Sequence, residues 1–510
     1  MRKLSLFVVL CMMVSIFTAC SGSGSSGSTP SSSSEAPSSS AASQADASNE
    51  EAVTLKLVFQ GDAETADLVQ VQDAMDALTV PAINARVELT RISHGAFNDQ
   101  LNLMLSSGEV LDLVNLRQLN TLTLTSNGTI RPLTQLLQDY GKETLDAISQ
   151  SDWDCCYING EIMVVPANKD KAYQMCILMD KAICDELGIP YGQSATLDEI
   201  HDYLVKVRDA YPNMYPVVTE AGGNLHSYLG NDVLGDNFGV ILDIYSDELK
   251  VENLFTSDLF KNLCERMWNW AQEGLIMPDG ASNTDTANSL MASGKAFARI
   301  NTRKPGYENE RSVQIGKEVV SLSFMEPFTM TDAVSTTYGW AIPYSSENPE
   351  KAMELLNMLY TNPELANIMC NGAEGVHWVY TDENKTHIRY PDGKNSSNVG
   401  YNRVTYVQPN QQITVPWEND DADIWQQLDE FNRTAHASPA KGFVYDNRAV
   451  LNEVTACTNV KNKYWNGLLC GSLDPAVAIP QLNAELEANG IDRIIAEKQR
   501  QLDEWAANRK

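Results

Sequence analysis

Short apolar segments alternate with amphipathic helices near the start of the chain, and this alternation limits the possible folds more than any other feature. Residues 54–59, 87–92 and 111–116 are apolar runs of strand length. In 67–78 and 96–105 the apolar side chains recur every three or four residues, which is the period of a helix. The order β-α-β-α-β predicts a parallel sheet covered by helices on both faces. We therefore expect an α/β protein.

Turn and capping residues mark further elements. Asn159-Gly160 predicts the tight turn of a hairpin over 157–162, because both residues tolerate positive φ angles. Thr196 and Glu199 have the spacing of a capping box at the start of a helix. The other predicted elements are strands at 175–179, 296–300 and 337–342, helices at 259–271 and 349–360, a hairpin at 377–390 and a helical tail over 474–510.

Size and charge narrow the classes of function. The segment from Val53 onward is about 450 residues long, which is too large for one hydrophobic core and predicts two lobes. The formal net charge of the chain is -30. A surface this acidic repels phosphate backbones, so we expect no nucleic-acid partner.

Cysteine and carboxylate patterns give no sign of a metal or cofactor. Eight cysteines follow residue 150, at irregular spacing, and we expect buried free thiols, with disulfides as the alternative for an exported chain. Neither C-x-x-C nor H-E-x-x-H occurs, so a zinc site is not predicted. The acidic run Asp420-Asp421-Asp423 lacks the spaced ligands and turn glycine of a calcium loop.

The N-terminal segment indicates export. Residues 1–19 have a basic start, an apolar run and a small-residue end, which is the pattern of a signal peptide. The ending Thr18-Ala19-Cys20 resembles the lipobox of bacterial lipoproteins, and this resemblance implies that Cys20 carries a lipid. Residues 20–52 are rich in Ser, Gly, Ala and Pro, so we expect a disordered tether. The protein would then be held on the outer face of the bacterial cytoplasmic membrane.

Several segments together resemble a known family. The order of segments resembles the family 1 extracellular solute-binding proteins of ABC importers, the group that includes maltose-binding protein. The matching segments are 96–109 with Asp112-Leu113-Val114, Asn159-Gly160-Glu161-Ile162 with Val165-Pro166, 291–297, and 341–352. Glu374-Gly375-Val376-His377-Trp378 and the helices over 464–505 resemble a lipoprotein subfamily with an extra uncharacterised C-terminal domain.

The resemblance implies a periplasmic-binding-protein-like fold of two α/β lobes with a ligand cleft between them. Carried onto this chain, it assigns 53–168 and 294–334 to lobe 1. Lobe 2 would contain 172–293 and 338–510, including the C-terminal helical extension.

Polar residues at strand ends are the first candidate ligand-binding groups. In open α/β sheets ligands bind outside the carboxyl ends of the strands. The side chains that follow predicted strands are Gln60, Asp62, Asn115, Arg117, Asn301 and Arg303. Amide and guanidinium groups can hold vicinal hydroxyls. The alternative is that each of them only caps a helix or meets water.

Aromatic residues are the second component of a sugar site, because the apolar face of a pyranose stacks on aromatic rings. Trp153, Trp340 and Trp378 lie at or near predicted segment ends, and Glu374 and His377 stand beside Trp378. We expect Trp378 to form a stacking platform, with a structural hairpin corner as the alternative.

The function that follows is solute capture. We expect a lipid-anchored, monomeric receptor that binds a small solute, most simply an oligosaccharide, and delivers it to the transmembrane subunits of an ABC permease. Such a receptor is not an enzyme and needs no cofactor or metal. The alternative is a lipid-anchored glycan-processing hydrolase with two carboxylates flanking the scissile bond, although no G-x-S-x-G motif of a serine hydrolase occurs.

Overall fold

The computed structural model describes residues 51–117, 119–220, 230–331, 338–396, 398–401, 403 and 405–508. These residues belong to one compact unit that begins at Glu51. The signal peptide, Cys20, the tether up to residue 50 and Val334, at a predicted lobe boundary, lie outside the described residues.

The first sheet is built from the predicted β-α-β-α-β unit, which the structure confirms. β1 (Val53–Gln60) pairs in parallel with β2 (Ala85–Ile92) and with β3 (Leu113–Asn115). The connecting helices are α1 (Thr65–Ile83) and α2 (Phe97–Ser107). β11 (Trp340–Ala341) joins the other side of β3 as an antiparallel strand, giving the order β11-β3-β1-β2.

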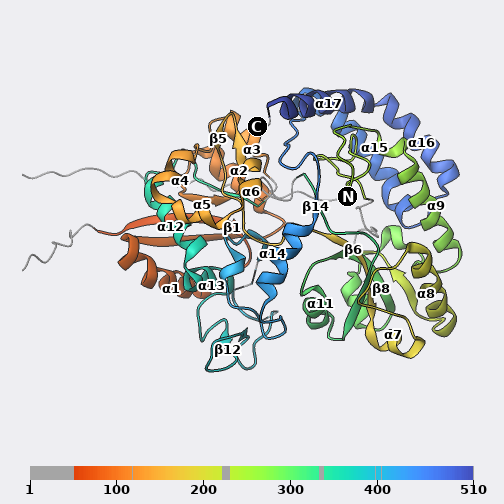
Figure 1. Ribbon diagram of the computed structural model, residues 1–510, viewed down its shortest axis with the longest axis horizontal. Helices are drawn as coiled ribbons and strands as arrows, with labels where there is room; N and C mark the ends of the chain where they lie inside the picture. Colours follow the sequence, from red (N-terminus) through yellow and green to blue (C-terminus); the bar gives the residue numbers. More distant parts are fainter. Residues whose placement is uncertain are drawn as a thin grey trace, which may run out of the picture. The chain divides into compact units, whose positions relative to one another are not determined.

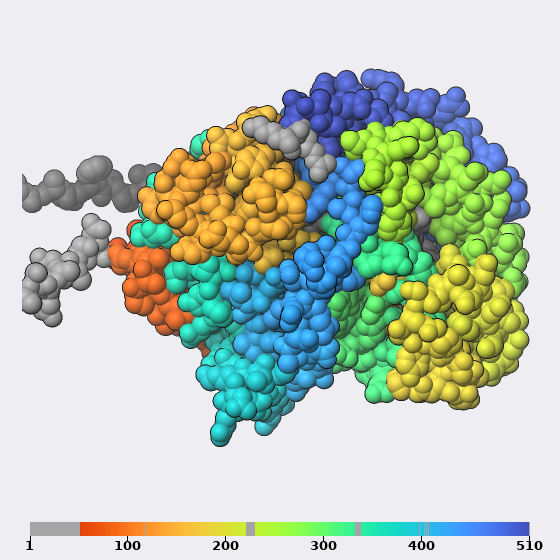
Figure 2. Space-filling model, in the orientation of Figure 1, coloured from red at the N-terminus to blue at the C-terminus, as the bar shows by residue number. Residues whose placement is uncertain are grey.

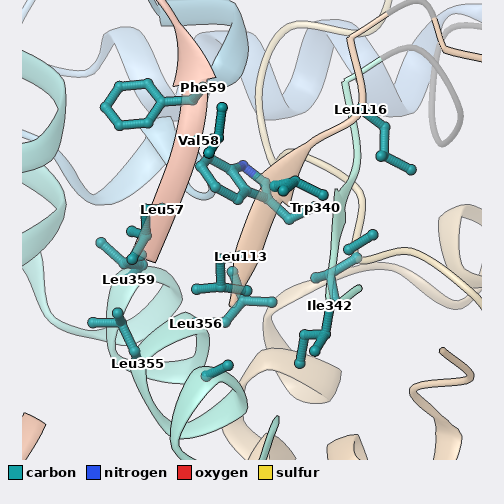
Figure 3. Close-up of a cluster of buried hydrophobic side chains, with 14 of the residues drawn as sticks. Leu57, Val58, Phe59, Leu113, Leu116, Trp340, Ile342, Leu355, Leu356 and Leu359 are labelled. Carbon is teal, nitrogen blue, oxygen red and sulfur yellow. The ribbon is translucent and has the colours of Figure 1, made fainter. Parts of the chain in front are cut away.

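One hydrophobic core surrounds this sheet. α12 (Pro349–Thr361) contributes Leu355, Leu356 and Leu359, which are fully buried and lie near Leu57 and Leu113 of the sheet (Figure 3). α4 (Thr134–Tyr140), α5 (Lys142–Ala147) and α13 (Pro363–Asn371) complete the cover. α1, α12 and α13 lie beside β1 in Figure 1.

The second sheet has four strands in the order β7-β8-β6-β9. Its central strand, β6 (Gln174–Asp180), is buried along its whole length and runs antiparallel to β8 (Ala296–Arg303) and β9 (Val319–Ser323). β7 (Tyr215–Val218) pairs in parallel with β8. The associated helices are α7 (Lys181–Leu187), α8 (Leu197–Ala210), α9 (Asp258–Gln272), α10 (Ala287–Ala292) and α11 (Tyr307–Ile315).

The sheet pairing corrects the predicted lobe boundaries. Residues 294–334 were assigned to lobe 1, but β8 and β9 pair with β6. β11 and α12, which were assigned to lobe 2 within 338–510, belong to the first sheet and its core. An apolar strand pattern shows that a segment is buried, and it does not show which of two sheets the segment joins. We therefore define the first lobe as 51–165 with 338–434, and the second lobe as 174–327 with 443–508.

The C-terminal helices have a core of their own. α15 (Leu451–Leu469), α16 (Pro475–Ala488) and α17 (Ile491–Asn508) pack with one another, and α15 and α16 also pack against α9. Their buried side chains cluster with those of 234–264. In Figures 1 and 2 the blue helices lie along the green segment that includes α9. This arrangement makes the C-terminal helices part of the second lobe.

Smaller elements complete the chain. The Asn159-Gly160 turn has positive φ angles of 55° and 84°, and the predicted hairpin over 157–162 is present. The predicted capping box of Thr196 and Glu199 is also present. The remaining strands are β4 (Tyr157–Ile158), β5 (Glu161–Ile162), β10 (Phe328–Thr329), β12 (Val379–Tyr380), β13 (Ile388–Arg389) and β14 (His436–Ala437). The remaining α-helices are α3 (Thr121–Ser126), α6 (Gln150–Trp153) and α14 (Ile424–Thr434), and the short 3-10 helices are η1 (Asp154–Cys156), η2 (Leu254–Thr256), η3 (Gly280–Ser282), η4 (Thr405–Val407), η5 (Gln411–Ile413) and η6 (Arg448–Val450).

Two further observations concern the described residues. None of their helices combines the length and the apolar character needed to cross a bilayer. The eight cysteines after residue 150 are buried free thiols, which confirms the first of the two alternatives for them.

Candidate functional site

The carboxyl ends of β1 and β3 bring three predicted site residues together. Gln60 is the last residue of β1 and Asn115 is the last residue of β3, and Arg117 lies two residues after β3. All three are buried, and Arg117 Nη1 donates to Gln60 Oε1 at 2.9 Å. The backbone N–H of Arg117 donates to Asn115 Oδ1 at 3.3 Å. Asp62 lies two residues beyond β1 and is exposed.

Three residues that the sequence did not single out complete this cluster. His94 follows β2, and its Nδ1 lies 2.8 Å from Gln60 Nε2. Asn115 Nδ2 donates to the backbone oxygen of Tyr338 at 2.9 Å. Lys169 Nζ lies 4.8 Å from the centre of the Tyr338 ring, and the Arg117 guanidinium lies 5.7 Å from it. We call Gln60, His94, Asn115, Arg117, Lys169 and Tyr338 the strand-end cluster.

A local signal existed for only one of these three residues. His94 lies two residues after the end of β2, the strand that pairs with β1, so the strand-end rule could have found it. Tyr338 and Lys169 reach the cluster from segments far from it in sequence, and no local pattern marks them.

Lys169 of the cluster and the neighbouring Lys304 both pair with the Asp170 carboxylate. Burial lowers the pKa of Lys169, and the neighbouring Asp170 carboxylate only partly offsets this effect. Burial raises the pKa of Asp170, but the ammonium groups of Lys169 and Lys304 outweigh it, so the pKa lies below its ordinary value. Lys304 Nζ lies 3.2 Å from Asp170 Oδ1. The cluster therefore includes one end of a row of alternating charges, in which Lys169 is buried and Asp170 and Lys304 are partly buried.

Asn301 and Arg303 lie apart from the strand-end cluster, on β8 of the second sheet. Arg303 Nε donates to Glu308 Oε1 at 2.9 Å, and its Nη1 donates to Gln174 Oε1 at 3.0 Å. The backbone N–H of Thr302 donates to Asn301 Oδ1 at 2.7 Å. Arg303, the last residue of β8, lies opposite Gln174, the first residue of β6. Arg303 is therefore at the end of the second sheet where β6 begins.

The three predicted tryptophan platforms are core residues, which corrects the prediction. Trp153, Trp340 and Trp378 are all buried, with at most 3% of each residue exposed. Their ring N–H groups donate to backbone oxygens of Leu145, Val407 and Gly372, respectively. Figure 3 shows the Trp340 ring between Val58 and the side chains of β3. A ring that is enclosed and bonded in this way has no free face for a sugar.

The group around Trp378 is a structural corner. His377 is buried, and its Nδ1 accepts a hydrogen bond from the backbone N–H of Ala373 at 2.9 Å. The proton must then lie on Nε2, which donates to Asp67 Oδ1 of α1 at 2.9 Å. Gly372 has a φ of +89°, and a Cβ atom there would lie 2.6 Å from the His377 ring. Glu374 is exposed on the outside of the same corner. These contacts correct the assignment of Glu374, His377 and Trp378 to one sugar site.

An open groove of about 560 Å³ lies elsewhere, between α8 and α9. His201 bridges the two helices there, with Nδ1 3.1 Å from Asp202 Oδ1 and Nε2 2.9 Å from Glu273 Oε2. The hydrogen bond with Glu273 contributes most to raising the pKa of His201. In the part of the chain that the structure describes, no group of three or more His, Cys, Asp or Glu side chains is placed to hold a metal ion.

Comparison with known proteins decides the family. Residues 65–366 match the family model described as "Bacterial extracellular solute-binding protein". The chain belongs to this family. Residues 439–507 match a domain of unknown function, DUF3502. Both findings confirm the resemblance seen in the sequence.

The relatives of this solute-binding protein extend over nearly the whole chain. A carbohydrate ABC transporter substrate-binding protein of Streptococcus pneumoniae is 24% identical over 484 residues, which cover 89% of this chain and 94% of that one. The crystal structure of the N-glycan transport solute binding protein NgtS from the same species has a TM-score of 0.80 at 23% identity and covers 90% of this chain and all of its own. An extracellular solute-binding protein of Bifidobacterium longum subsp. infantis has a TM-score of 0.61 at 17% identity and covers 88% of this chain and 98% of its own. These structures show that the fold is that of two-lobed solute-binding proteins.

Proposed function

We propose that this solute-binding protein captures an oligosaccharide outside the cell and delivers it unchanged to an ABC-type permease. The strand-end cluster is the observation that carries the proposal, because it gathers amide, guanidinium, imidazole and phenol groups at the ends of parallel strands. Relatives support the class of ligand. One is named a carbohydrate substrate-binding protein, and NgtS has been crystallised with Man5GlcNAc and with Man1GlcNAc.

The chemistry of the cluster suits sugar hydroxyls. The Arg117 guanidinium is a planar fork of donors of the kind that pairs with neighbouring hydroxyls. Gln60 and Asn115 are buried and already hydrogen-bonded within the cluster, so their part is to hold the Arg117 side chain and the Tyr338 backbone in place. Tyr338 is partly buried and takes the place of the predicted tryptophans as the aromatic side chain of the cluster. Asp62, Asn301 and Arg303 remain candidates for contacts at the edge of the site.

Calorimetric titration with neutral oligosaccharides, Man5GlcNAc among them, tests the proposal. Gln60→Ala removes the amide that holds the Arg117 guanidinium, and it should weaken binding by about thirtyfold, which corresponds to about 2 kcal/mol. Gln135→Ala is the matched control, because Gln135 is exposed and its side chain donates to Asp139 within α4. A thermal melt of each variant separates lost contacts from lost folding. Equal affinities for wild type and Gln60→Ala would remove the strand-end cluster from the site.

The hydrolase alternative makes a different prediction. A receptor returns its ligand intact, whereas a glycosidase cleaves it between two carboxylates. Mass spectrometry of the oligosaccharide after prolonged incubation with the protein distinguishes the two. We expect only intact ligand, and a shortened product would contradict the receptor.

The manner of attachment and the partners complete the proposal. We propose that the mature chain is a monomer that begins at a lipid-bearing Cys20, and that residues 21–52 tether it to the outer face of the bacterial cytoplasmic membrane. A family of extracellular proteins and a lipobox-like sequence at Thr18-Ala19-Cys20 support this proposal. The permease subunits would then lie within reach of the tether.

A further inference from the structure

Three passages of the chain lie side by side where it crosses between the lobes, and we call them the junction: 168–173, 328–331 and 436–442. Tyr173 and Phe328 exchange backbone hydrogen bonds of 2.8 Å. Phe328 and Thr329 pair in parallel with His436 and Ala437. The backbone N–H of Gly442 continues this contact by donating to the oxygen of Thr331 at 3.1 Å. The first and second passages are therefore joined by backbone pairing, as are the second and third.

The side chain of Asp152 adds a direct link between the first and third passages. Its carboxylate is only 7% exposed. Oδ2 lies 2.5 Å from the ammonium group of Lys171, in the first passage, and Oδ1 lies 2.9 Å from that of Lys441, in the third. Asp152 itself belongs to α6 of the first lobe, so one side chain ties both passages to that lobe.

The charge of Asp152 is essential to this link. Burial raises the pKa of Asp152, but the two ammonium groups outweigh it, so the pKa stays below its ordinary value and the group is a carboxylate at neutral pH. Neutralising this carboxylate would leave the buried ammonium group of Lys171 and the partly buried one of Lys441 without this counter-charge, which costs more than losing an exposed ion pair.

Lys441 belongs to the domain of unknown function, and the backbone next to it packs closely against the first lobe. Gly442, the next residue, has a φ of +93°, and a Cβ atom there would lie 3.0 Å from Cys155 of the first lobe. At the far end of the domain, the fully buried Lys498 of α17 donates to Asp236 Oδ1 at 2.6 Å and to the oxygen of Gly239 at 2.8 Å. The domain is thus anchored in the second lobe by Lys498 and reaches the first lobe through Lys441.

We propose that Asp152 is a positioning residue for ligand binding and that the C-terminal domain supplies, through Lys441, one half of an ionic clasp across the junction. The clasp sets the spacing of the first and third passages. Lys169 lies two residues before Lys171, so the same clasp holds its ammonium group over the Tyr338 ring in the strand-end cluster. The effect on binding rests on the proposed function, whereas the effect on the junction does not.

Hydrogen–deuterium exchange of the unliganded protein tests the junction directly. Asp152→Asn and Lys441→Met should each raise exchange at least tenfold in peptides covering 168–173 and 436–442. The matched control is Asp154→Asn, because Asp154 is exposed and its carboxylate accepts a hydrogen bond from Gln150, one turn back in the same segment. Lys441→Arg, which keeps the charge, should restore most of the protection. Unchanged exchange in both Asp152→Asn and Lys441→Met would overturn the clasp.

Titration of the same variants with Man5GlcNAc tests the positioning role. We expect Asp152→Asn and Lys441→Met to bind at least tenfold more weakly than wild type and Lys441→Arg to bind within threefold of it. If exchange rises but the affinity stays at the wild-type value, the positioning role is overturned and the clasp is structural only. If wild type itself binds no oligosaccharide, the proposed function fails, and the exchange data still decide the clasp. If Asp152→Asn does not fold, the titration of Lys441→Met alone decides the positioning role.

Discussion

At the scale of single residues, Trp378 stabilises the fold through packing and one ring hydrogen bond. It is 3% exposed, and its Nε1 donates to the oxygen of Gly372 at 2.7 Å. Trp378→Ala should therefore lower the free energy of unfolding by about 3–5 kcal/mol. Trp378→Phe keeps most of the packing and should cost about 1 kcal/mol for the lost bond. Thermal melts measure both changes, and a titration in which the folded Trp378→Ala protein lost ligand affinity would return this ring to the binding site.

A second residue-scale prediction concerns His201 and pH. The pKa of His201 is raised, so its ion pair with Glu273 stabilises the fold fully below the unfolded-state pKa of about 6.5. That stabilisation is lost as the pH rises through the higher folded-state pKa. Because His201 and Glu273 are 29% and 42% exposed, the contribution should be below about 1 kcal/mol.

The melting temperatures of wild type and His201→Gln, compared from about pH 5.5 to about pH 8.5, check this prediction. The advantage of wild type should be largest at the acidic end and should shrink as the pH rises. Glu273→Gln is the control, and it should remove most of the pH dependence. A wild-type advantage that grows with pH would contradict the assignment.

Part of the candidate site could be predicted from single residues. The strand-end rule found Gln60, Asn115 and Arg117 because each lies at the end of its strand or within two residues of it. The separate choice of tryptophans near segment ends selected only buried rings, because sequence position does not reveal whether a ring is enclosed by side chains from distant segments. Tyr338 and Lys169 reach the cluster only through the tertiary fold.

At the scale of elements, the cap of α8 gives a measurable prediction. Thr196 Oγ1 accepts from the backbone N–H of Glu199 at 3.2 Å, and Glu199 Oε2 accepts from the backbone N–H of Thr196 at 2.8 Å. Thr196→Ala should cost about 1 kcal/mol of stability in a denaturant titration. Glu64→Ala is the control, because Glu64 is the N-cap of α1 and makes no side-chain cap bond. Equal losses in the two variants would show that the capping box is not the cause.

The elements themselves were largely predictable, whereas their assembly was not. The β-α-β-α-β unit, the Asn159-Gly160 hairpin and the α8 cap each depend on residues close in sequence, so local patterns suffice. The sheet that β8 joins depends on its pairing with β6, from Gln174 opposite Arg303 to Met179 opposite Ala298. That pairing joins segments more than a hundred residues apart, and both possible sheets would accept the same apolar strand.

At the scale of the whole molecule, the anchor and the folded unit should be separable. Cys20 precedes the compact unit that begins at Glu51, so Cys20→Ser should release the protein from the membrane fraction and leave its melting temperature unchanged. Fractionation of cells that express each form measures the first effect, and melts of the purified proteins measure the second. Ser26→Ala, in the same tether, is the control. Membrane association that persists in Cys20→Ser would contradict the lipid anchor.

The last prediction concerns movement of the two lobes. The three passages of the junction are the segments through which the chain crosses between the lobes, so a bound solute that contacts both lobes should draw them together by bending there. Small-angle scattering should then show a smaller radius of gyration when Man5GlcNAc is added to the protein. An oligosaccharide that shows no binding in the calorimetric titration is the control, and it should leave the radius of gyration unchanged. Identical scattering curves with and without a saturating ligand would contradict closure.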